Sequence, residues 1–91
     1  MVKAVLAEVK GRVTGVGFRY SVYAKALETG GITGYVRNVS SGHVEVLLQG
    51  NEPAVGALLS FISKGPPLAR VTAFAVSDIP VDETITTFNI R

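Results

Sequence analysis

The chain has 91 residues, of which 47% are hydrophobic and 18% are charged, and it carries a net charge of +2. The length predicts a single domain spanning residues 1–91, and the composition is too apolar for an intrinsically disordered chain. The sequence contains no cysteine, which excludes disulfides, thiolate zinc sites and a cysteine nucleophile. The longest apolar runs have four residues, far fewer than a membrane span needs, so we expect a cytoplasmic protein without a membrane partner.

The first predicted elements are a strand and a helix joined by a glycine-rich loop. Residues 3–10 alternate between apolar and polar side chains, as in a half-buried strand. Residues 11–17 contain three glycines and are predicted to form a loop. From Phe18 the apolar residues recur with helical spacing, and Gly30 and Gly31 are predicted to end this helix.

A hairpin and a second helix come next. Residues 33–39 are rich in β-branched and aromatic side chains, and residues 42–49 alternate, which predicts two strands. Residues 40–42, Ser-Ser-Gly, are predicted to form the turn between them. Asn51 is predicted to cap a second amphipathic helix, which the Gly-Pro-Pro run at residues 65–67 ends.

Two β-rich segments follow the second helix, residues 69–78 and residues 84–90, with residues 80–83 as their connection. The element order is therefore βαββαβ, with the last segment either a short additional strand or the bent end of the fourth. This order is typical of an α+β, ferredoxin-like sandwich, in which an antiparallel sheet carries two helices on one face.

Positive charge is concentrated around the glycine-rich loop. The residues up to Glu45 carry a net charge of +3, and the remainder carry −1. Lys10, Arg12 and Arg19 flank the loop or lie in it. A small anion is a better candidate partner than a nucleic acid, because nucleic-acid binders usually carry a longer basic stripe.

The loop itself has the features of an anion site. It joins a strand to a helix, so main-chain N–H groups collect at the helix N-terminus, where anions bind readily. It lacks the Gly-Lys-Ser/Thr of a Walker A loop and the third glycine of a dinucleotide fingerprint. Arg19 adds a planar fork of donors that suits a phosphate. The alternative interpretation of the glycines is a tight turn with no ligand.

A second segment, residues 34–50, contains Asn38 at a strand end beside the hairpin. Considered alone, Asn38 is typical of a turn. His43 is the only histidine and is predicted to be a surface residue of the following strand, because no second histidine or cysteine accompanies it to hold a metal.

Taken together, the two segments resemble a known family. The pattern G-x-V-x-G-V-x-F-R over residues 11–19 and the pattern G-Y-V-R-N-x3-G-x-V-x5-G over residues 34–50 are similar to the two signature segments of the acylphosphatases. The likeness extends over nearly the whole chain, since length and element order also agree. One departure is Thr14, where the family commonly has glutamine.

The resemblance implies that Arg19 and Asn38 are the catalytic residues, Arg19 binding the phosphate and Asn38 positioning the attacking water. It also implies that main-chain amides enclose the phosphate oxygens at residues Thr14, Gly15, Val16, Gly17, Phe18 and Arg19. The reaction implied is hydrolysis of the carboxyl–phosphate anhydride of acyl phosphates to a carboxylate and inorganic phosphate. It would need no metal or other cofactor, and we expect a monomer.

Two alternatives stay open at the level of sequence. The first is a non-catalytic ferredoxin-like module that binds an anion or a partner at the same loop. The second is a relative of the acylphosphatase-like domain at the N-terminus of hydrogenase-maturation proteins.

Overall fold

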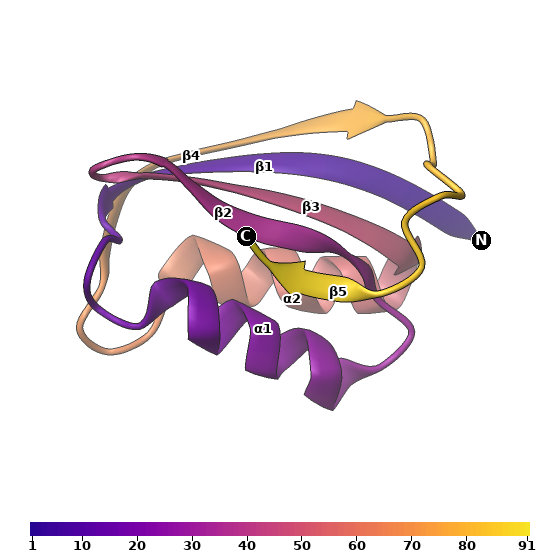
Figure 1. Ribbon diagram of the computed structural model, residues 1–91, viewed down its shortest axis with the longest axis horizontal. Helices are drawn as coiled ribbons and strands as arrows, with labels where there is room; N and C mark the ends of the chain where they lie inside the picture. The colour runs from indigo at the N-terminus through magenta and orange to yellow at the C-terminus, as the bar shows by residue number, and fades with distance from the viewer.

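A five-stranded sheet with two helices packed against one face makes up the protein, shown as a computed structural model describing residues 1–91 (Figure 1). The elements, in chain order, are β1 (Val2–Arg12), α1 (Phe18–Thr29), β2 (Thr33–Ser40), β3 (His43–Asn51), α2 (Glu52–Lys64), β4 (Arg70–Ile79) and β5 (Phe88–Ile90). The strand order is β4-β1-β3-β2-β5, with antiparallel pairing from β4 through β2. The ferredoxin-like sandwich is confirmed.

The last strand corrects one part of the prediction, because the sheet is not wholly antiparallel. β4 and β5 are separate strands on opposite edges, and β5 pairs in parallel with β2. The chain leaves β4 at one end of the sheet and crosses that end to reach β2, so β5 has to run in the direction of β2 (Figure 1).

Residues 84–87, which were predicted to be part of the last strand, belong to this crossing instead. The Asp82 carboxylate accepts hydrogen bonds from the N–H and the hydroxyl of Thr84, at 3.0 and 2.6 Å. The buried side chain of Gln49 also bonds to both the N–H and the carbonyl of Asp82, at 2.6 and 3.0 Å. These bonds hold a turn where a strand was expected.

Both helices bury one narrow face against the sheet. α1 contributes Phe18 and Val22, and α2 contributes Leu58 and Ile62, all almost completely buried. Asn51 stands at the N-cap position of α2 in an extended conformation, but its side chain makes no capping hydrogen bond, contrary to its predicted role.

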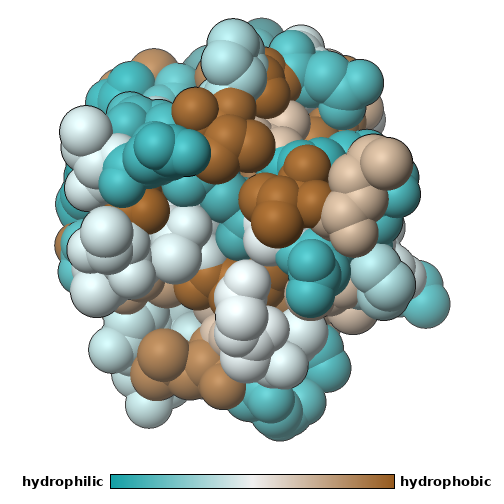
Figure 2. Space-filling model, turned by 90° about the vertical axis from the view of Figure 1, so that its right-hand side faces the viewer, coloured by the Kyte–Doolittle hydropathy of each residue, from teal (hydrophilic) through white to brown (hydrophobic).

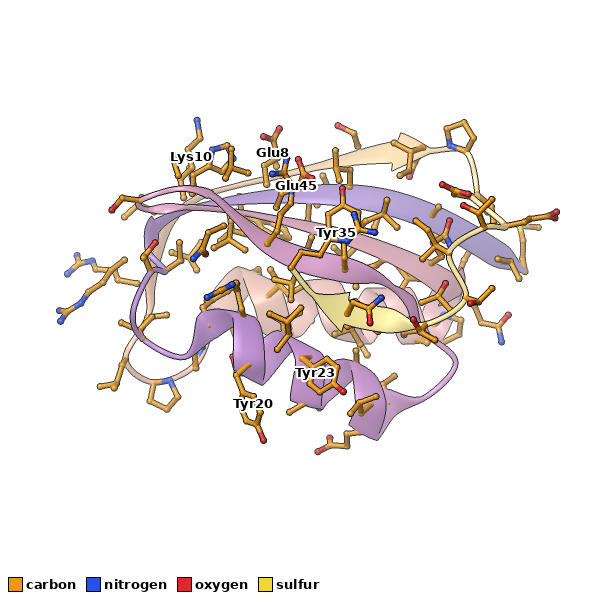
Figure 3. The ribbon with its side chains drawn as sticks, in the orientation of Figure 1. Glu8, Lys10, Tyr20, Tyr23, Tyr35 and Glu45 are labelled. Carbon is orange, nitrogen blue, oxygen red and sulfur yellow. The ribbon has the colours of Figure 1, made fainter.

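The two faces of the sheet have different environments. The face under the helices is lined by almost fully buried aliphatic residues: Val5, Ala7, Val9, Val36, Val44, Val46 and Leu48. The other face is free of helices and carries polar side chains, among them Glu8, Tyr35 and Glu45, which point away from α1 and α2 (Figure 3). On the helix side of the sheet, Tyr23 of α1 packs on Phe88 of β5, with ring centroids 6.4 Å apart.

The end of the molecule opposite the β1–α1 loop has a mixed surface. Figure 2 shows hydrophobic side chains there as separate patches among hydrophilic ones. Scattered apolar residues of this kind are ordinary on protein surfaces. Neither helix has the length and hydrophobicity required to cross a membrane.

We predict that Leu48→Ala lowers the free energy of unfolding by about 2 to 5 kcal/mol, because it leaves a cavity in the core between sheet and helices. Leu27→Ala is the matched control, since Leu27 is 60% exposed on α1, and it should change the free energy by less than about 0.5 kcal/mol. Denaturant unfolding measures both values. Equal losses in the two variants would contradict the placement of this core.

Candidate active site

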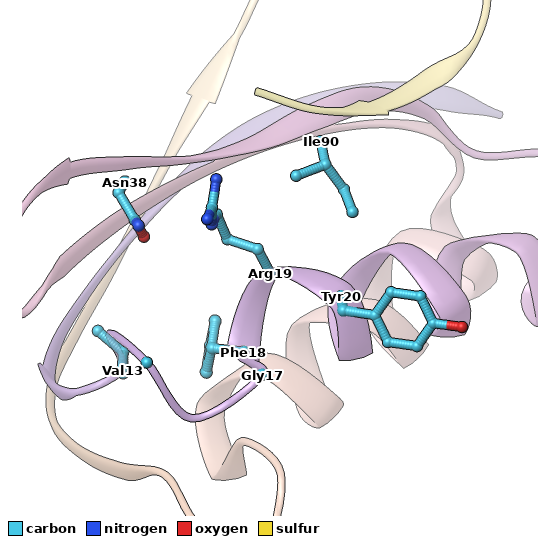
Figure 4. A pocket seen from close by; sticks show the side chains of 8 residues that line it. Val13, Gly17, Phe18, Arg19, Tyr20, Asn38 and Ile90 are labelled. Atoms are coloured by element: carbon cyan, nitrogen blue, oxygen red, sulfur yellow. The ribbon is translucent and has the colours of Figure 1, made fainter.

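The loop between β1 and α1 forms one wall of a cavity of about 200 Å3 (Figure 4). The lining residues are Val13, Gly15, Gly17, Phe18, Arg19, Tyr20, Asn38 and Ile90. They come from the loop, the first turn of α1, β2 and β5, so the fold brings distant parts of the sequence to one place.

The main chain of the loop has the conformation of an anion-binding concavity. Gly15 and Gly17 have φ values of 73° and 74°, in the left-handed region, and no residue other than glycine has a positive φ. Val16 therefore separates two left-handed glycines. Turns that contain left-handed residues can bring successive main-chain N–H groups together on one side, which favours a bound anion. Side chains at positions 15 and 17 would strain this conformation.

The first turn of α1 adds further donors to the same wall. Gly17 is the N-cap and makes no side-chain hydrogen bond, and no acidic residue lies in the first turn. The N–H of Ser21 donates to the carbonyl of Gly17, at 3.0 Å. The N–H groups before Ser21 in the helix therefore have no acceptor within it, and the positive end of the helix dipole faces the cavity. An anion is stabilised at such a position.

Arg19 extends from this turn towards the sheet, between Asn38 and Ile90 (Figure 4). Its Nη1 donates to the main-chain oxygen of Arg91, at 2.9 Å. No Asp or Glu carboxylate lies within ion-pair distance of Arg19. A guanidinium has five N–H donors, so most of those of Arg19 remain open to a ligand.

Asn38 reaches the cavity from β2. It pairs with Val44 of β3, which faces the helices. Its Oδ1 is buried and accepts no hydrogen bond from the protein. A buried acceptor without a donor costs free energy, so a native structure usually supplies a partner for it. A ligand or a water in the cavity that donates to Oδ1 would remove this cost.

The cavity unites most of the residues that the sequence had singled out. Gly15, Gly17, Phe18, Arg19 and Asn38 line it together. The cavity therefore joins the two sequence segments through one residue of β2 and four residues of the loop and helix.

Thr14 and Val16, which were also predicted to bind phosphate, do not line the cavity. The Thr14 hydroxyl accepts a hydrogen bond from the N–H of Gly42, at 2.9 Å, and Val16 packs against the hydrophobic core.

Sequence reasoning missed three lining residues, Val13, Tyr20 and Ile90. Tyr20 could have been found, because it follows Arg19 in the first turn of the helix. No sequence signal pointed to Ile90, since its place depends on the parallel pairing of β5 with β2.

His43 opens β3, as predicted for a strand residue, and its Nε2 lies 3.1 Å from Oε1 of Glu8. The structure contains no group of three or more His, Asp or Glu side chains that could hold a metal ion.

A sequence model of the acylphosphatase family matches residues 5–90. This chain belongs to the acylphosphatase family. An acylphosphatase from Methylococcus capsulatus (strain Bath) is 44% identical over 88 residues, which cover 97% of this chain and 95% of the relative.

Solved structures agree with the family assignment. The crystal structure of acylphosphatase from Bacillus subtilis matches with a TM-score of 0.90 at 34% identity, covering 100% of this chain and 99% of that one. The crystal structure of full-length HypF, in a phosphate- and nucleotide-bound form, also has a TM-score of 0.90, at 29% identity. The match covers 100% of this chain but only 12% of HypF.

A polar cluster of Tyr35, Arg37 and Glu45 lies on the open face of the sheet, which is the face without helices. The hydroxyl of Tyr35 donates to Oε2 of Glu45 at 2.6 Å, and Nε of Arg37 donates to the same oxygen at 3.0 Å. Burial alone would raise the pKa of Glu45, but these hydrogen bonds and the charge of Arg37 bring the pKa below its usual value. Burial and the neighbouring Glu45 raise the pKa of Tyr35.

This cluster is connected to Arg19 through Arg91. The guanidinium of Arg91 lies over the Tyr35 ring, 4.1 Å from its centroid, and the N–H of Arg91 donates to the carbonyl of Val36 at 2.8 Å. Arg91 is therefore held at both its main chain and its side chain, and its main-chain oxygen is the acceptor for Arg19. The open face of the sheet thus helps to fix the direction of the cavity's arginine.

We predict that Glu45→Gln lowers the free energy of unfolding at pH 7, and that this loss depends on pH. The folded-state pKa of Glu45 is lowered, so its contribution is complete above the unfolded pKa and disappears as the pH falls through the folded one. The difference between parent and variant should be constant near neutral pH and shrink below about pH 4. Denaturant unfolding across this pH range measures the difference.

The matched control is Glu28→Gln, because the Glu28 side chain is 73% exposed in its ion pair with Lys25. Exposed pairs of this kind contribute little to stability. A loss in Glu45→Gln that is no larger than that of Glu28→Gln at every pH would contradict the role given to the cluster.

Proposed function

We propose that this cavity hydrolyses acyl phosphates, giving a carboxylate and inorganic phosphate. The observation that carries the proposal is the buried Oδ1 of Asn38, which has no hydrogen-bond partner and belongs to the same cavity as Arg19 and the free amides of α1. Donors suited to a phosphate and an acceptor suited to a water are thus within one small space. Membership of the acylphosphatase family supports the same reaction.

The phosphoryl group occupies the concavity of the β1–α1 loop. The main-chain amides of Gly15, Gly17 and Phe18, which line the cavity, donate to the phosphoryl oxygens. Thr14 and Val16, whose amides were also predicted to donate, are neighbours of these residues in the loop but do not line the cavity. The Arg19 guanidinium supplies positive charge from the side of the sheet. Hydrogen bonds to a charged group contribute about 1.5–3 kcal/mol each, so a few such donors bind the dianion and stabilise its transition state.

Asn38 orients the attacking water. Its Oδ1 accepts a hydrogen bond from the water, which fixes the water oxygen for in-line attack on phosphorus. The new P–O bond forms as the bond between phosphorus and the acyl oxygen breaks, and that electron pair leaves with the carboxylate. An amide does not accept a proton at neutral pH, so the proton of the water passes to a phosphate oxygen.

The leaving group explains why so few side chains suffice. A carboxylate leaves with a pKa near that of Asp or Glu, about 4, so no general acid is needed to protonate it. The remaining requirements are to hold the phosphoryl group, to spread its charge over donors and to align the water. Main-chain amides, one arginine and one asparagine meet these requirements.

We propose that the chain acts as a monomer in the cytoplasm and binds no nucleic acid. The proposal that it binds no nucleic acid is supported by its positive charge, which is concentrated at one loop rather than spread along a stripe.

We predict that Arg19→Ala and Asn38→Ala fail in different ways. Arg19 contacts phosphate in both the ground state and the transition state, so Arg19→Ala should weaken phosphate inhibition by about 10- to 150-fold and lower kcat/KM as well. Asn38 acts on the water, so Asn38→Ala should lower kcat by at least about 10-fold while inhibition by phosphate stays close to the parent value. Steady-state kinetics with a synthetic acyl phosphate and a phosphate titration measure both effects.

Two matched controls separate these roles from general effects of charge and polarity. Arg12→Ala removes an arginine that does not line the cavity, and Asn89→Ala removes an asparagine of β5 that also lies outside it. Both should keep the parent kinetics. Normal turnover in Asn38→Ala would show that the water is positioned by another group, and parent-like phosphate inhibition in Arg19→Ala would place the anion elsewhere.

We predict that exhaustive chelation leaves turnover unchanged, because the donors of the loop and Arg19 take the place of a Lewis acid and the leaving carboxylate needs none. Acyl phosphate hydrolysis is measured before and after treatment with EDTA, and again after adding magnesium or zinc. A loss of rate that either metal restores would show that the mechanism needs a cation.

A further inference from the structure

The side chain of Thr14 connects the β1–α1 loop, which is the phosphate loop of the proposed function, to the hairpin that carries Asn38. Its Oγ1 accepts a hydrogen bond from the N–H of Gly42 at 2.9 Å, a length typical of a well-formed bond. Gly42 belongs to the turn between β2 and β3. Its carbonyl in turn accepts from the N–H of Gly11 at 3.1 Å, so both of its main-chain polar groups are bonded to the segment that leads into the loop.

Close packing accompanies these two bonds. Gly42 has a φ of 75°, which favours glycine, and a Cβ at this position would stand 3.2 Å from the Gly11 carbonyl oxygen. The turn therefore lies directly against the end of β1, and a side chain at Gly42 would push the two apart. Gly42 is the point at which the two sequence segments of the site meet.

Asn38 depends on this meeting point because the ladder beside it is irregular. Asn38 pairs with Val44 and Ser40 pairs with His43, so Val39 is an extra residue in β2. A bulge of this kind bends a strand and changes the direction of neighbouring side chains. No hydrogen bond from the protein reaches Oδ1 of Asn38 either. The position of Asn38 relative to the loop is therefore set by the hydrogen bonds that hold the β2–β3 turn.

We infer that Thr14 is a positioning residue, which fixes the hairpin of Asn38 against the phosphate loop without touching the substrate. Thr14 does not line the cavity, so its hydroxyl acts through the N–H of Gly42. Threonine suits this task because branching at Cβ restricts its rotamers and keeps the hydroxyl in place. The inference rests on the proposed function.

The first test compares Thr14→Val, which keeps the shape but removes the acceptor, with Thr14→Ser, which keeps the hydroxyl. Loss of one hydrogen bond should lower kcat by about 2- to 12-fold in Thr14→Val, with phosphate inhibition within about twofold of the parent. Thr14→Ser should retain most of the rate that Thr14→Val loses. Thr72→Val is the matched control, because the Thr72 hydroxyl bonds the Lys10 carbonyl, at 3.3 Å, away from the cavity.

A second measurement reports on the bond itself, independently of turnover. Amide hydrogen exchange of Gly42 should accelerate in Thr14→Val and remain at the parent rate in Thr72→Val. Unchanged exchange at Gly42 in Thr14→Val would overturn the inference, as would a parent-like kcat. Thermal melts of the variants verify that each one is folded under the assay conditions.

A double-mutant cycle identifies the residue through which Thr14 acts. If it acts through Asn38, Thr14→Val should have no further effect on kcat in a chain that already carries Asn38→Ala. The same fold-loss in both backgrounds would overturn the inference while leaving the proposed function intact. A parent-like kcat in Asn38→Ala alone would instead refute the water-positioning role, and the inference would fall with it.

Discussion

The antiparallel pairing of β1 with β3 is the constraint on which the site depends. β3 is the central strand of the sheet and β1 lies beside it, and their register places Lys10 opposite His43. The end of β1 and the start of β3 therefore lie side by side. The β1–α1 loop follows β1 and the β2–β3 turn precedes β3, so this strand pair determines how far apart the two sequence segments of the site can be. The hydrogen bonds of Gly42 then join two segments that the β1–β3 pairing has already brought close together.

β2 serves the site from both of its faces, which explains the density of functional residues in a short segment. Alternate side chains of a strand point to opposite faces. Val36 and Asn38 face the helices, where one packs in the core and the other lines the cavity. Tyr35 and Arg37 face the other way and bind Glu45. The strand thus presents the unpartnered Oδ1 of Asn38 to the cavity on one side and holds Arg91, the partner of Arg19, on the other.

Sequence patterns could predict those parts of the site that depend on local structure. The glycines of the loop and the start of α1 at Phe18 follow from spacing and backbone preference, and the resemblance to a family added roles for Arg19 and Asn38. Ile90 could not be found in this way, because its place in the cavity results from a crossing to the opposite edge of the sheet. The bond from Gly42 to Thr14 was equally out of reach, since it joins residues 28 positions apart in sequence through tertiary packing.

The composition of the site also explains why a chain of this size can maintain it. Most of its donors are main-chain N–H groups, which need no side-chain entropy to be ordered beyond that of the fold itself. The one charged donor, Arg19, is held at a single point by the carbonyl of Arg91, and its other donors stay free. The desolvation cost of an unpaired buried charge is avoided as well, because the cavity opens beside the exposed side chains of Tyr20 and Ile90. In the proposed function a small anion is therefore bound by backbone geometry, with side chains needed only to add charge and to align the water.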